Sequence, residues 1–173
     1  MESTRAFGVL ARLAARRVLT ADRVAAAKWV SGRSIDDPAR ERQVLDAVDV
    51  RARELGIDRA DARRIIGDQI EASKLVQRRL HEHWRNNPRE APTAGPDLGR
   101  VREEISRIDA ELLTALRRAR PVPAAAGAAG ACARTRADVA GELLLGDPYR
   151  QGLRRALRGL CGTRDPGASP DGR

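Results

Sequence analysis

The sequence predicts an all-α protein, a single-domain bundle of about six helices. Aromatic residues make up only 2% of the 173 residues, and no segment shows the sustained apolar alternation, flanked by turn residues, that is typical of a β-hairpin. Apolar residues instead recur at three- and four-residue steps through most of the chain. Because 42% of the residues are hydrophobic, the chain can bury a core, and a disordered protein is not expected.

The first predicted helix covers about residues 5–30. Its inward positions follow helical spacing and include two cations: Phe7, Leu10, Ala14, Arg17, Ala21, Val24 and Lys28. Arg17 and Lys28 therefore share one face, separated by about three turns or roughly 16 Å of helix axis.

The second and third helices have clear start signals. Asp37 before Pro38 is typical of an N-cap followed by proline in the first turn, and this helix should end near Gly56. The third helix is predicted from about residue 58 to residue 84.

The apolar stripe of that third helix is interrupted by two polar residues, Ser73 and Gln77. Buried hydroxyl and amide groups are costly without partners. These side chains must therefore bond within the protein or face a polar cavity.

The second half of the chain contains two segments rich in helix-breaking residues. Residues 87–96 predict a linker, and the Pro/Ala/Gly stretch at 121–131 has no predicted fixed conformation. A fourth helix between them has its apolar residues in near-heptad spacing: Leu98, Val101, Ile105, Ile108, Leu112 and Leu116. Two shorter helices are predicted at about 133–145 and 148–161.

The sequence thus predicts one domain over residues 1–162. Its first part is residues 5–86, which carry most of the candidate site. The linker at 87–96 leads to a second half at 97–162. Residues 163–173 are predicted to be a disordered tail.

The charge is strongly basic, and nearly all of it is guanidinium. The net charge is +9, and only Lys28 and Lys74 are lysines. Such a surface attracts nucleic acid, anionic membranes or a small polyanionic substrate. Four arginines gather on the last predicted helix: Arg150, Arg154, Arg155 and Arg158. A basic helical nucleic-acid-binding protein is therefore one alternative, although helix-turn-helix signals, zinc-ligand spacing and interleaved aromatic residues are all missing from the sequence.

Eight polar residues at inward-facing or helix-start positions form the candidate site: Arg17, Lys28, Asp37, Arg40, Glu41, Ser73, Gln77 and Arg102. Four are cations, and none is an obvious nucleophile. Such a set suits the binding of a small dianion better than hydrolysis. His81 and His83 do not predict a metal site, because residues two apart on a helix point to different faces.

Three segments resemble the all-helical, AroQ-type chorismate mutases: RVLTADRVAAAKW, IDDPARERQVLDAV and DQIEASKLVQ. The resemblance covers residues 5–85. A later segment, PDLGRVREEISRIDAELLTAL, resembles the opening of the first helix in shorter members of that class and so looks like a partial second repeat. In the longer, exported (gamma) subclass such a segment supplies an arginine that a partner chain provides in the short dimeric members, and Arg102 occupies that position.

The resemblance implies an isomerase of the shikimate pathway and aromatic amino acid biosynthesis, which rearranges chorismate into prephenate without cofactor or metal. Three arginines would then hold the two substrate carboxylates: Arg17, Arg40 and Arg102. Lys28 and Gln77 would donate to the ether oxygen. The remaining three would position the hydroxyl group and a carboxylate: Asp37, Glu41 and Ser73. A catalytically silent relative that binds an aromatic metabolite or regulates a partner is the second alternative.

The two cysteines are too few for a disulfide framework or a zinc site, and their own spacing leaves a single bridge open. The surrounding sequence, with DPYRQGLRRAL between them, resembles the C-terminal disulfide region of the exported subclass, which implies a bridge between Cys132 and Cys161. The resemblance also implies a secreted or periplasmic homodimer with a complete site in each chain, and no nucleic-acid or membrane partner. A cytoplasmic location is the alternative, since residues 1–20 do not resemble a signal peptide or membrane span.

Overall fold

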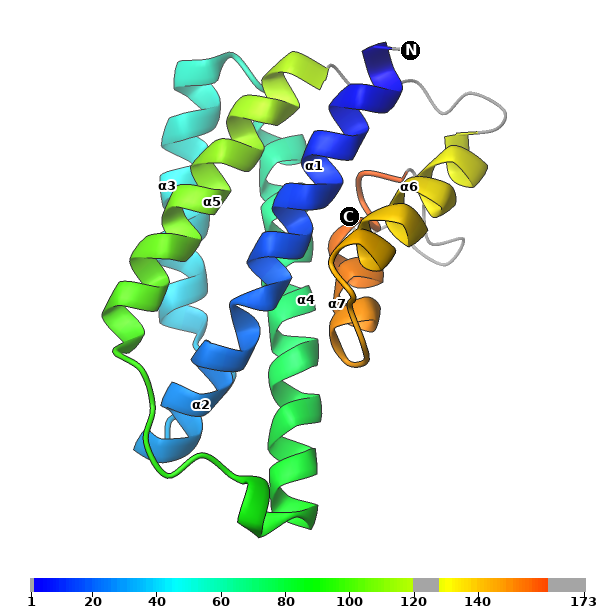
Figure 1. Ribbon diagram of the computed structural model, residues 1–173. Coiled ribbons are helices and arrows are strands. Elements are labelled where there is room, and N and C mark those ends of the chain that lie inside the picture. The colour runs from blue at the N-terminus through cyan, green and yellow to red at the C-terminus, as the bar shows by residue number, and fades with distance from the viewer. Residues whose placement is uncertain (1, 120–127, 162–173) are drawn as a thin grey trace, which may run out of the picture.

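The computed structural model describes residues 2–119 and 128–161, and their side chains from residue 5 onward except at 128–129 (Figure 1). These residues form seven α-helices and one short 3₁₀-helix: α1 (Glu2–Leu19), α2 (Ala21–Ser31), α3 (Pro38–Leu55), α4 (Arg59–Asn86), η1 (Pro88–Glu90), α5 (Leu98–Ala119), α6 (Ala128–Glu142) and α7 (Tyr149–Ala156). No strand occurs among them, so the predicted all-α class is confirmed. The predicted tail at 163–173 and most of the stretch at 121–131 lie outside the described residues.

The first predicted helix is wrong in one respect, because it is divided at Thr20 into α1 and α2. The Thr20 hydroxyl donates to the carbonyl of Arg17 at 2.7 Å, and the Thr20 amide donates to the same carbonyl at 3.1 Å. At this point a bond to the carbonyl three residues back replaces the α-helical bond to the carbonyl four residues back, and α2 follows α1 at a slight bend (Figure 1). Arg17 and Lys28 therefore belong to two successive helices, and both are buried.

The next two helices begin where the sequence predicts. Asp37 accepts a hydrogen bond from the Arg40 amide at 3.0 Å, and Asp58 accepts one from the Asp61 amide at 2.9 Å, so both are side-chain N-caps. Helix α3 ends at Gly56, whose φ of +65° is a conformation that glycine adopts without steric penalty.

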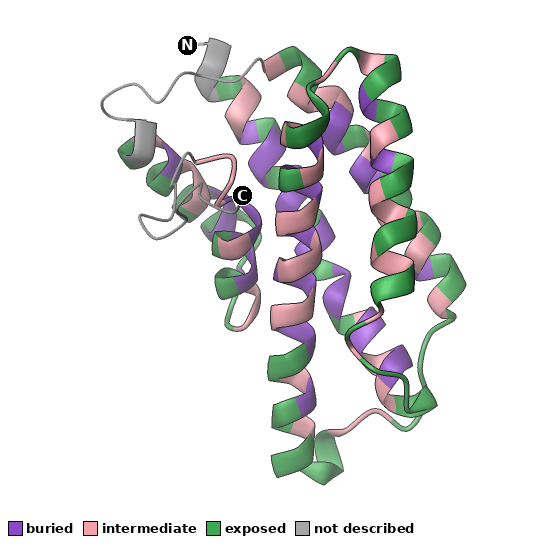
Figure 2. Cartoon of the chain, turned by 180° about the vertical axis from the view of Figure 1, so that it is seen from behind, coloured by how far each residue is buried: buried purple, intermediate pink, exposed green. Residues whose placement is uncertain are grey.

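Helix α1 lies at the centre of the bundle and contributes to two cores. Leu10 and Leu13 pack with α3, α4 and α5 around Ile66 and Ile108. The opposite side of α1 is lined by small residues that pack with α4, α6 and α7: Ala11, Ala14, Ala15 and Val18. Figure 2 shows the buried residues on the inward sides of the helices and the exposed ones outside. Within the described residues, no helix has the length and apolar character needed to cross a membrane.

The linker returns the chain from the far end of α4 to α5, passing α2 on the way (Figure 1). Its approach to α2 is so close at Gly95 that a Cβ atom there would lie 2.8 Å from the Ala27 Cα atom. This crossing sets where α5 begins, and hence where Arg102 lies.

The C-terminal helices form a small unit docked on α1 and α4. Cys132 of α6 and Cys161, which follows α7, form a disulfide with their Cα atoms 5.8 Å apart, so the bridge implied by the resemblance is confirmed. A Cβ atom on Gly152 would lie 2.7 Å from Val76 Cγ2 and 2.9 Å from Val18 Cγ1. Glycine at this position therefore lets α7 fit closely between α1 and α4.

Candidate active site

The site is built around Lys28, which is only 5% exposed near the end of α2. Its ammonium donates to the Ile35 carbonyl at 2.6 Å, in the loop before α3. Burial lowers the pKa of Lys28 below its ordinary value, and the nearby Arg102 guanidinium lowers it further, while the Asp37 carboxylate opposes both. A buried lysine held among opposing charges is typical of a functional site rather than of a solvated surface.

Asp37 and Arg102 form an ion pair that joins the start of α3 to α5. The Arg102 Nη2 atom donates to Asp37 Oδ2 at 3.0 Å, while Asp37 Oδ1 caps the Arg40 amide. The backbone hydrogen bond from Arg40, followed by the charges of Arg102 and Lys28, keeps the pKa of Asp37 below its ordinary value. Asp37 is therefore both a helix cap and part of the charged cluster.

The polar stripe on α4 is longer than the two residues, Ser73 and Gln77, that the sequence predicted. Four buried polar residues follow one another at four-residue steps: Gln69, Ser73, Gln77 and His81. The two outer ones bond to other helices, with Gln69 Nε2 donating to the Ala156 carbonyl at 2.8 Å and His81 Nε2 lying 2.9 Å from the Ala25 carbonyl. Among the described residues, the two inner side chains bond only to each other.

Gln77 Nε2 donates to Ser73 Oγ at 3.0 Å, which leaves Gln77 Oε1 buried without a partner among the described residues, as is Gln69 Oε1. The two ends of an amide are interchangeable by a flip. In the flipped arrangement the Ser73 hydroxyl donates to Gln77 Oε1, and the Gln77 NH₂ group is free to donate to a ligand. An unsatisfied buried group costs about 1–3 kcal/mol, and a bound acceptor would remove that cost.

Two ion pairs place the loop carrying Ile35 over the Ser73–Gln77 turn. Asp36 binds Arg78 at 2.7 Å and Lys74 at 3.5 Å. These two cations follow Gln77 and Ser73 directly in the sequence. The loop that holds the Lys28 ammonium therefore lies against the same part of α4 as the unpaired amide.

Arg17 has partners that the sequence analysis missed. It is 4% exposed, and Asp109 of α5 is 6% exposed. Arg17 Nε donates to Asp109 Oδ1 at 2.6 Å and Nη2 to Oδ2 at 3.3 Å, while Nη1 donates to the Gln69 carbonyl at 3.0 Å. Three of its five N–H groups are thus used, and the other two have no partner in the described part of the chain. Asp109 lies two turns after Arg102 on α5, and that spacing was the available signal.

Arg40 and Glu41 lie in the first turn of α3, next to Asp37 in the sequence, but their side chains do not contact Lys28 or Arg102 in the hydrogen bonds described. The Arg40 side chain donates to Gln43 on its own helix at 3.4 Å, so the structure does not bring its guanidinium together with the other candidates. Glu41 binds the Lys74 ammonium at 3.1 Å. Burial opposes the charge on Lys74, but the hydrogen bonds that its ammonium donates to the Glu71 and Glu41 carboxylates raise its pKa. Lys74, which the sequence analysis also missed, therefore fixes Glu41 from α4.

The two histidines are engaged separately. His81 faces Ala25 inside the bundle, whereas His83 lies 2.6 Å from the Glu90 carboxylate on the surface. They point apart, as their spacing predicts. Among the described residues, no cluster of three acidic, histidine or cysteine side chains is arranged to hold a metal ion.

Comparisons with known proteins agree on one family. The family model described as chorismate mutase type II matches residues 9–78. A secreted chorismate mutase from Mycobacterium tuberculosis is 28% identical over 95% of this chain and 83% of that protein. One from Mycolicibacterium smegmatis is 38% identical over 63% of this chain and 60% of that protein, so the match spans less than two thirds of that relative.

Solved structures match over nearly the whole chain. The chorismate mutase from Burkholderia phymatum superposes with a TM-score of 0.85 at 33% identity, covering 93% of this chain and 99% of that one. The enzyme from Burkholderia thailandensis gives a TM-score of 0.80 at 32% identity, covering 90% and 99%.

Proposed function

Because the chain belongs to the type II chorismate mutase family, we propose that it is a chorismate mutase, an isomerase that rearranges chorismate into prephenate. The reaction breaks an ether C–O bond and forms a C–C bond within one molecule. No proton has to move and no covalent intermediate is needed. The protein therefore has to fold the substrate and stabilise the charge that develops on the ether oxygen.

The observation that carries this function is a pair of buried donors, Lys28 and Gln77, whose helices are joined by the loop before α3. Both are buried, and in the part of the chain that the structure describes the Gln77 amide bonds only to Ser73 of its own helix. Donors that are fixed before the substrate arrives stabilise developing negative charge without reorganisation, and the loss of one such donor typically costs about 10²–10³ in rate. Lys28 and Gln77 would act on the ether oxygen in this way.

Three arginines would bind the two substrate carboxylates, for which their planar forks are suited. Arg17, oriented by Asp109, would use its two remaining N–H groups. Arg102 would share its guanidinium between Asp37 and the substrate. Arg40 would have to turn away from Gln43 to reach the ligand.

The remaining candidates would position the substrate. Asp37, Glu41 and Ser73 carry acceptor or hydroxyl groups suited to the substrate hydroxyl and to the edge of a carboxylate. Lys74 would act indirectly, by holding Glu41 in place.

One chain would supply the whole site. Arg102 reaches Asp37 of the same chain, as expected if the second repeat replaces the arginine of a partner. A homodimer stays a prediction, to be checked by light scattering. A secreted or periplasmic location is supported by the names of two relatives and by the disulfide, since such bridges persist in oxidising compartments.

The test is to follow chorismate and prephenate together after adding the purified protein. We expect each chorismate consumed to appear as prephenate, with kcat/KM lowered about 100-fold or more in Lys28→Ala and its circular dichroism unchanged. Saturable chorismate binding without prephenate formation would show instead the catalytically silent relative. A Lys28→Ala rate within threefold of wild type would refute the proposed site.

A further inference from the structure

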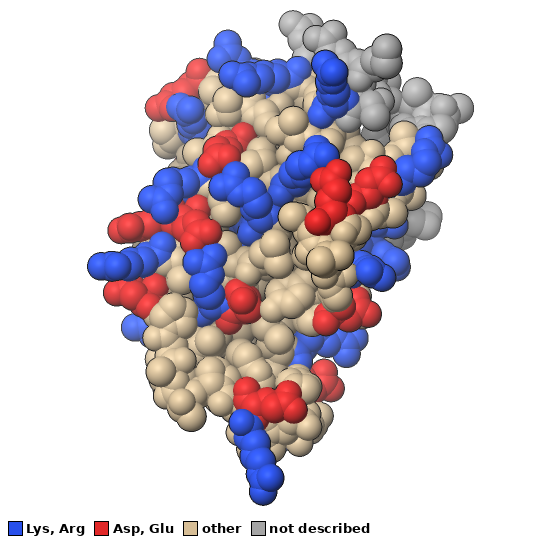
Figure 3. All heavy atoms as spheres, viewed as in Figure 1, with Lys and Arg blue, Asp and Glu red and all other residues tan. Residues whose placement is uncertain are grey.

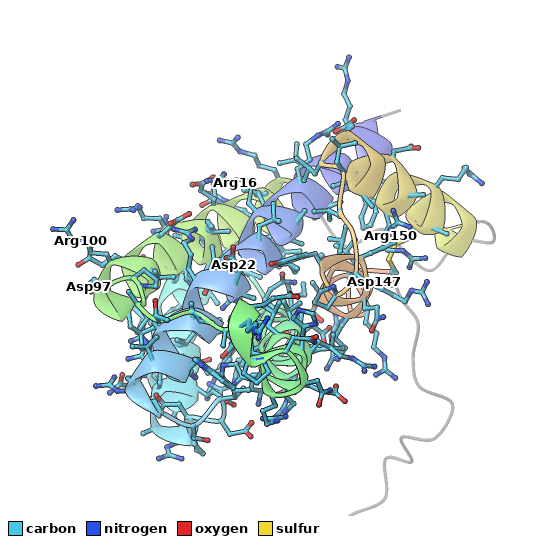
Figure 4. All side chains as sticks on the ribbon, turned by 60° about the horizontal axis from the view of Figure 1, so that its bottom comes forward. Arg16, Asp22, Asp97, Arg100, Asp147 and Arg150 are labelled. Carbon is cyan, nitrogen blue, oxygen red and sulfur yellow. A yellow bond between two sulfur atoms is a disulfide. The ribbon has the colours of Figure 1, made fainter. Side chains whose placement is uncertain are left out.

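A groove beside α7 brings together five arginines that the proposed active site does not use. It has a volume of about 740 Å³ and lies between α4, α6 and α7. Five arginines line it: Arg136, Arg150, Arg154, Arg155 and Arg158. Leu75 and Cys161 contribute its less polar wall, and Asp147 is the one acidic residue among its lining. Figure 4 labels Asp147 and Arg150 where the chain enters α7.

The charges in the groove are balanced differently from those on the face formed by α1, α5 and α6. On that face, cations and anions alternate (Figure 3) in ion pairs such as Arg12 with Glu142 and Arg16 with Glu111. In the groove, Arg155 has a carboxylate partner, Asp68 of α4.

Three groove arginines have no carboxylate partner in the described part of the chain. Arg150 donates to the Leu145 carbonyl at 3.0 Å, which does not neutralise it, and no ion pair with another described residue engages Arg136 or Arg154. Cations gathered in a concave site repel one another and raise the local concentration of anions.

We propose that this groove binds a small anion carrying at least two negative charges, a phosphate compound or a dicarboxylate. Its volume is within the range of about 300–1,000 Å³ found for small-ligand sites. Guanidinium groups bind both anion types through paired hydrogen bonds. The lining contains no aromatic side chain, and stacking on such side chains is the usual basis for single-stranded nucleic-acid binding.

The groove is separate from the candidate active site but shares α4 with it. Leu75 lies two residues from both Ser73 and Gln77, which is about 200° around the helix, so it faces the opposite side. The Arg155–Asp68 ion pair is also adjacent in sequence to the hydrogen bond between Gln69 and the Ala156 carbonyl.

The experiment is calorimetric titration with inorganic pyrophosphate and, separately, with succinate, at about 0.15 M salt, where diffuse attraction is screened beyond roughly 8 Å. The full-length wild type is compared with the double variant Arg136→Gln/Arg154→Gln. A second double variant, Arg12→Gln/Arg16→Gln, removes the same net charge from the paired face.

We expect saturable binding of one or both anions, weakened at least tenfold in Arg136→Gln/Arg154→Gln and changed less than twofold in Arg12→Gln/Arg16→Gln. The comparison of the two probes shows whether phosphate or carboxylate is preferred. Binding should persist in Lys28→Ala, which separates the groove from the active site.

The proposal is overturned if neither anion binds saturably at millimolar concentration, or if both double variants weaken binding equally, because the attraction would then reflect net charge alone. It is also overturned if a single-stranded oligonucleotide binds more tightly than both anions and loses that binding in Arg136→Gln/Arg154→Gln. Circular dichroism of both double variants controls for folding.

Discussion

Replacing Asp109 by Asn tests whether its ion pair holds Arg17 for substrate. The side chains of Arg17 and Asp109 are 5% and 9% exposed, so removing the carboxylate charge leaves a buried guanidinium without its counter-ion. Breaking one partner of a buried pair costs about 3–5 kcal/mol. Asparagine keeps one of the two acceptor oxygens, so we expect a loss of about 3 kcal/mol in the free energy of unfolding.

The matched control is Glu111→Gln on the same helix. Glu111 pairs with Arg16 at 2.9 Å, but these side chains are 49% and 52% exposed, and exposed pairs contribute about 0–1 kcal/mol. Urea unfolding gives the stabilities, and steady-state kinetics on chorismate give kcat and KM separately.

A positioning role predicts that Asp109→Asn lowers kcat/KM at least tenfold under conditions where the variant is fully folded, while Glu111→Gln stays within twofold. Asp109→Glu should recover part of the loss, since it restores the charge. If Asp109→Asn and Glu111→Gln give the same stability and the same kcat/KM, then Arg17 does not depend on this pair.

Three further outcomes follow from the geometry. Because burial lowers the pKa of Lys28 from 10.5, its cation is lost at a lower pH than that of an ordinary lysine, so kcat/KM should fall as the pH rises through the lowered pKa; an alkaline limb at or above 10.5 would contradict this assignment. Cys132→Ser opens a loop with a sequence separation of 29 and should lower the free energy of unfolding by about 3–4 kcal/mol in the chain-entropy model, with kcat/KM within threefold; equal denaturation midpoints would show that the bridge does not stabilise the fold. Gly152→Ala places a Cβ atom 2.7 Å from Val76 Cγ2, whereas the Cβ atom of Gly141→Ala meets no atom within 4 Å. Thermal unfolding should therefore show a loss of about 1–3 kcal/mol in the free energy of unfolding for Gly152→Ala and little or no loss for Gly141→Ala. Equal losses for the two variants would show that α7 does not pack closely against Val76.

The sequence was sufficient for features that depend on local chemistry. Asp37 and Asp58 mark their helix starts because an N-cap needs only an acceptor side chain and the next three residues. The break at Thr20 was missed because threonine also occurs within helices, and neither proline nor glycine marks the bend. The predicted ends of α6 and α7 were displaced by a few residues, because packing sets these ends and no local residue signal marks them.

The candidate site was predictable as a set of residue types but not as a set of contacts. The carboxylate that pairs with Arg17 lies 92 residues away, and no local rule connects the two. Lys74 looked like one more surface charge until the structure placed Glu41 and Glu71 around it. The orientation of Arg40 depends on which acceptors lie within reach of a long side chain, which only the folded chain defines.

The most direct test of the account is a pair of pH–rate profiles on chorismate, for wild type and for Gln77→Glu. The Gln77 amide donates a hydrogen bond without titrating, so wild-type kcat should be nearly flat from about pH 5 to 8. A glutamic acid at this buried position can donate only while protonated, and burial raises a carboxyl pKa. As the pH rises through that raised pKa, the side chain becomes a carboxylate that repels the negative charge on the ether oxygen. Gln77→Glu should therefore work best in acid and decline toward neutrality. A steep acid optimum in wild type, or full activity of Gln77→Glu at about pH 8, would show that Gln77 is not the donor to the ether oxygen.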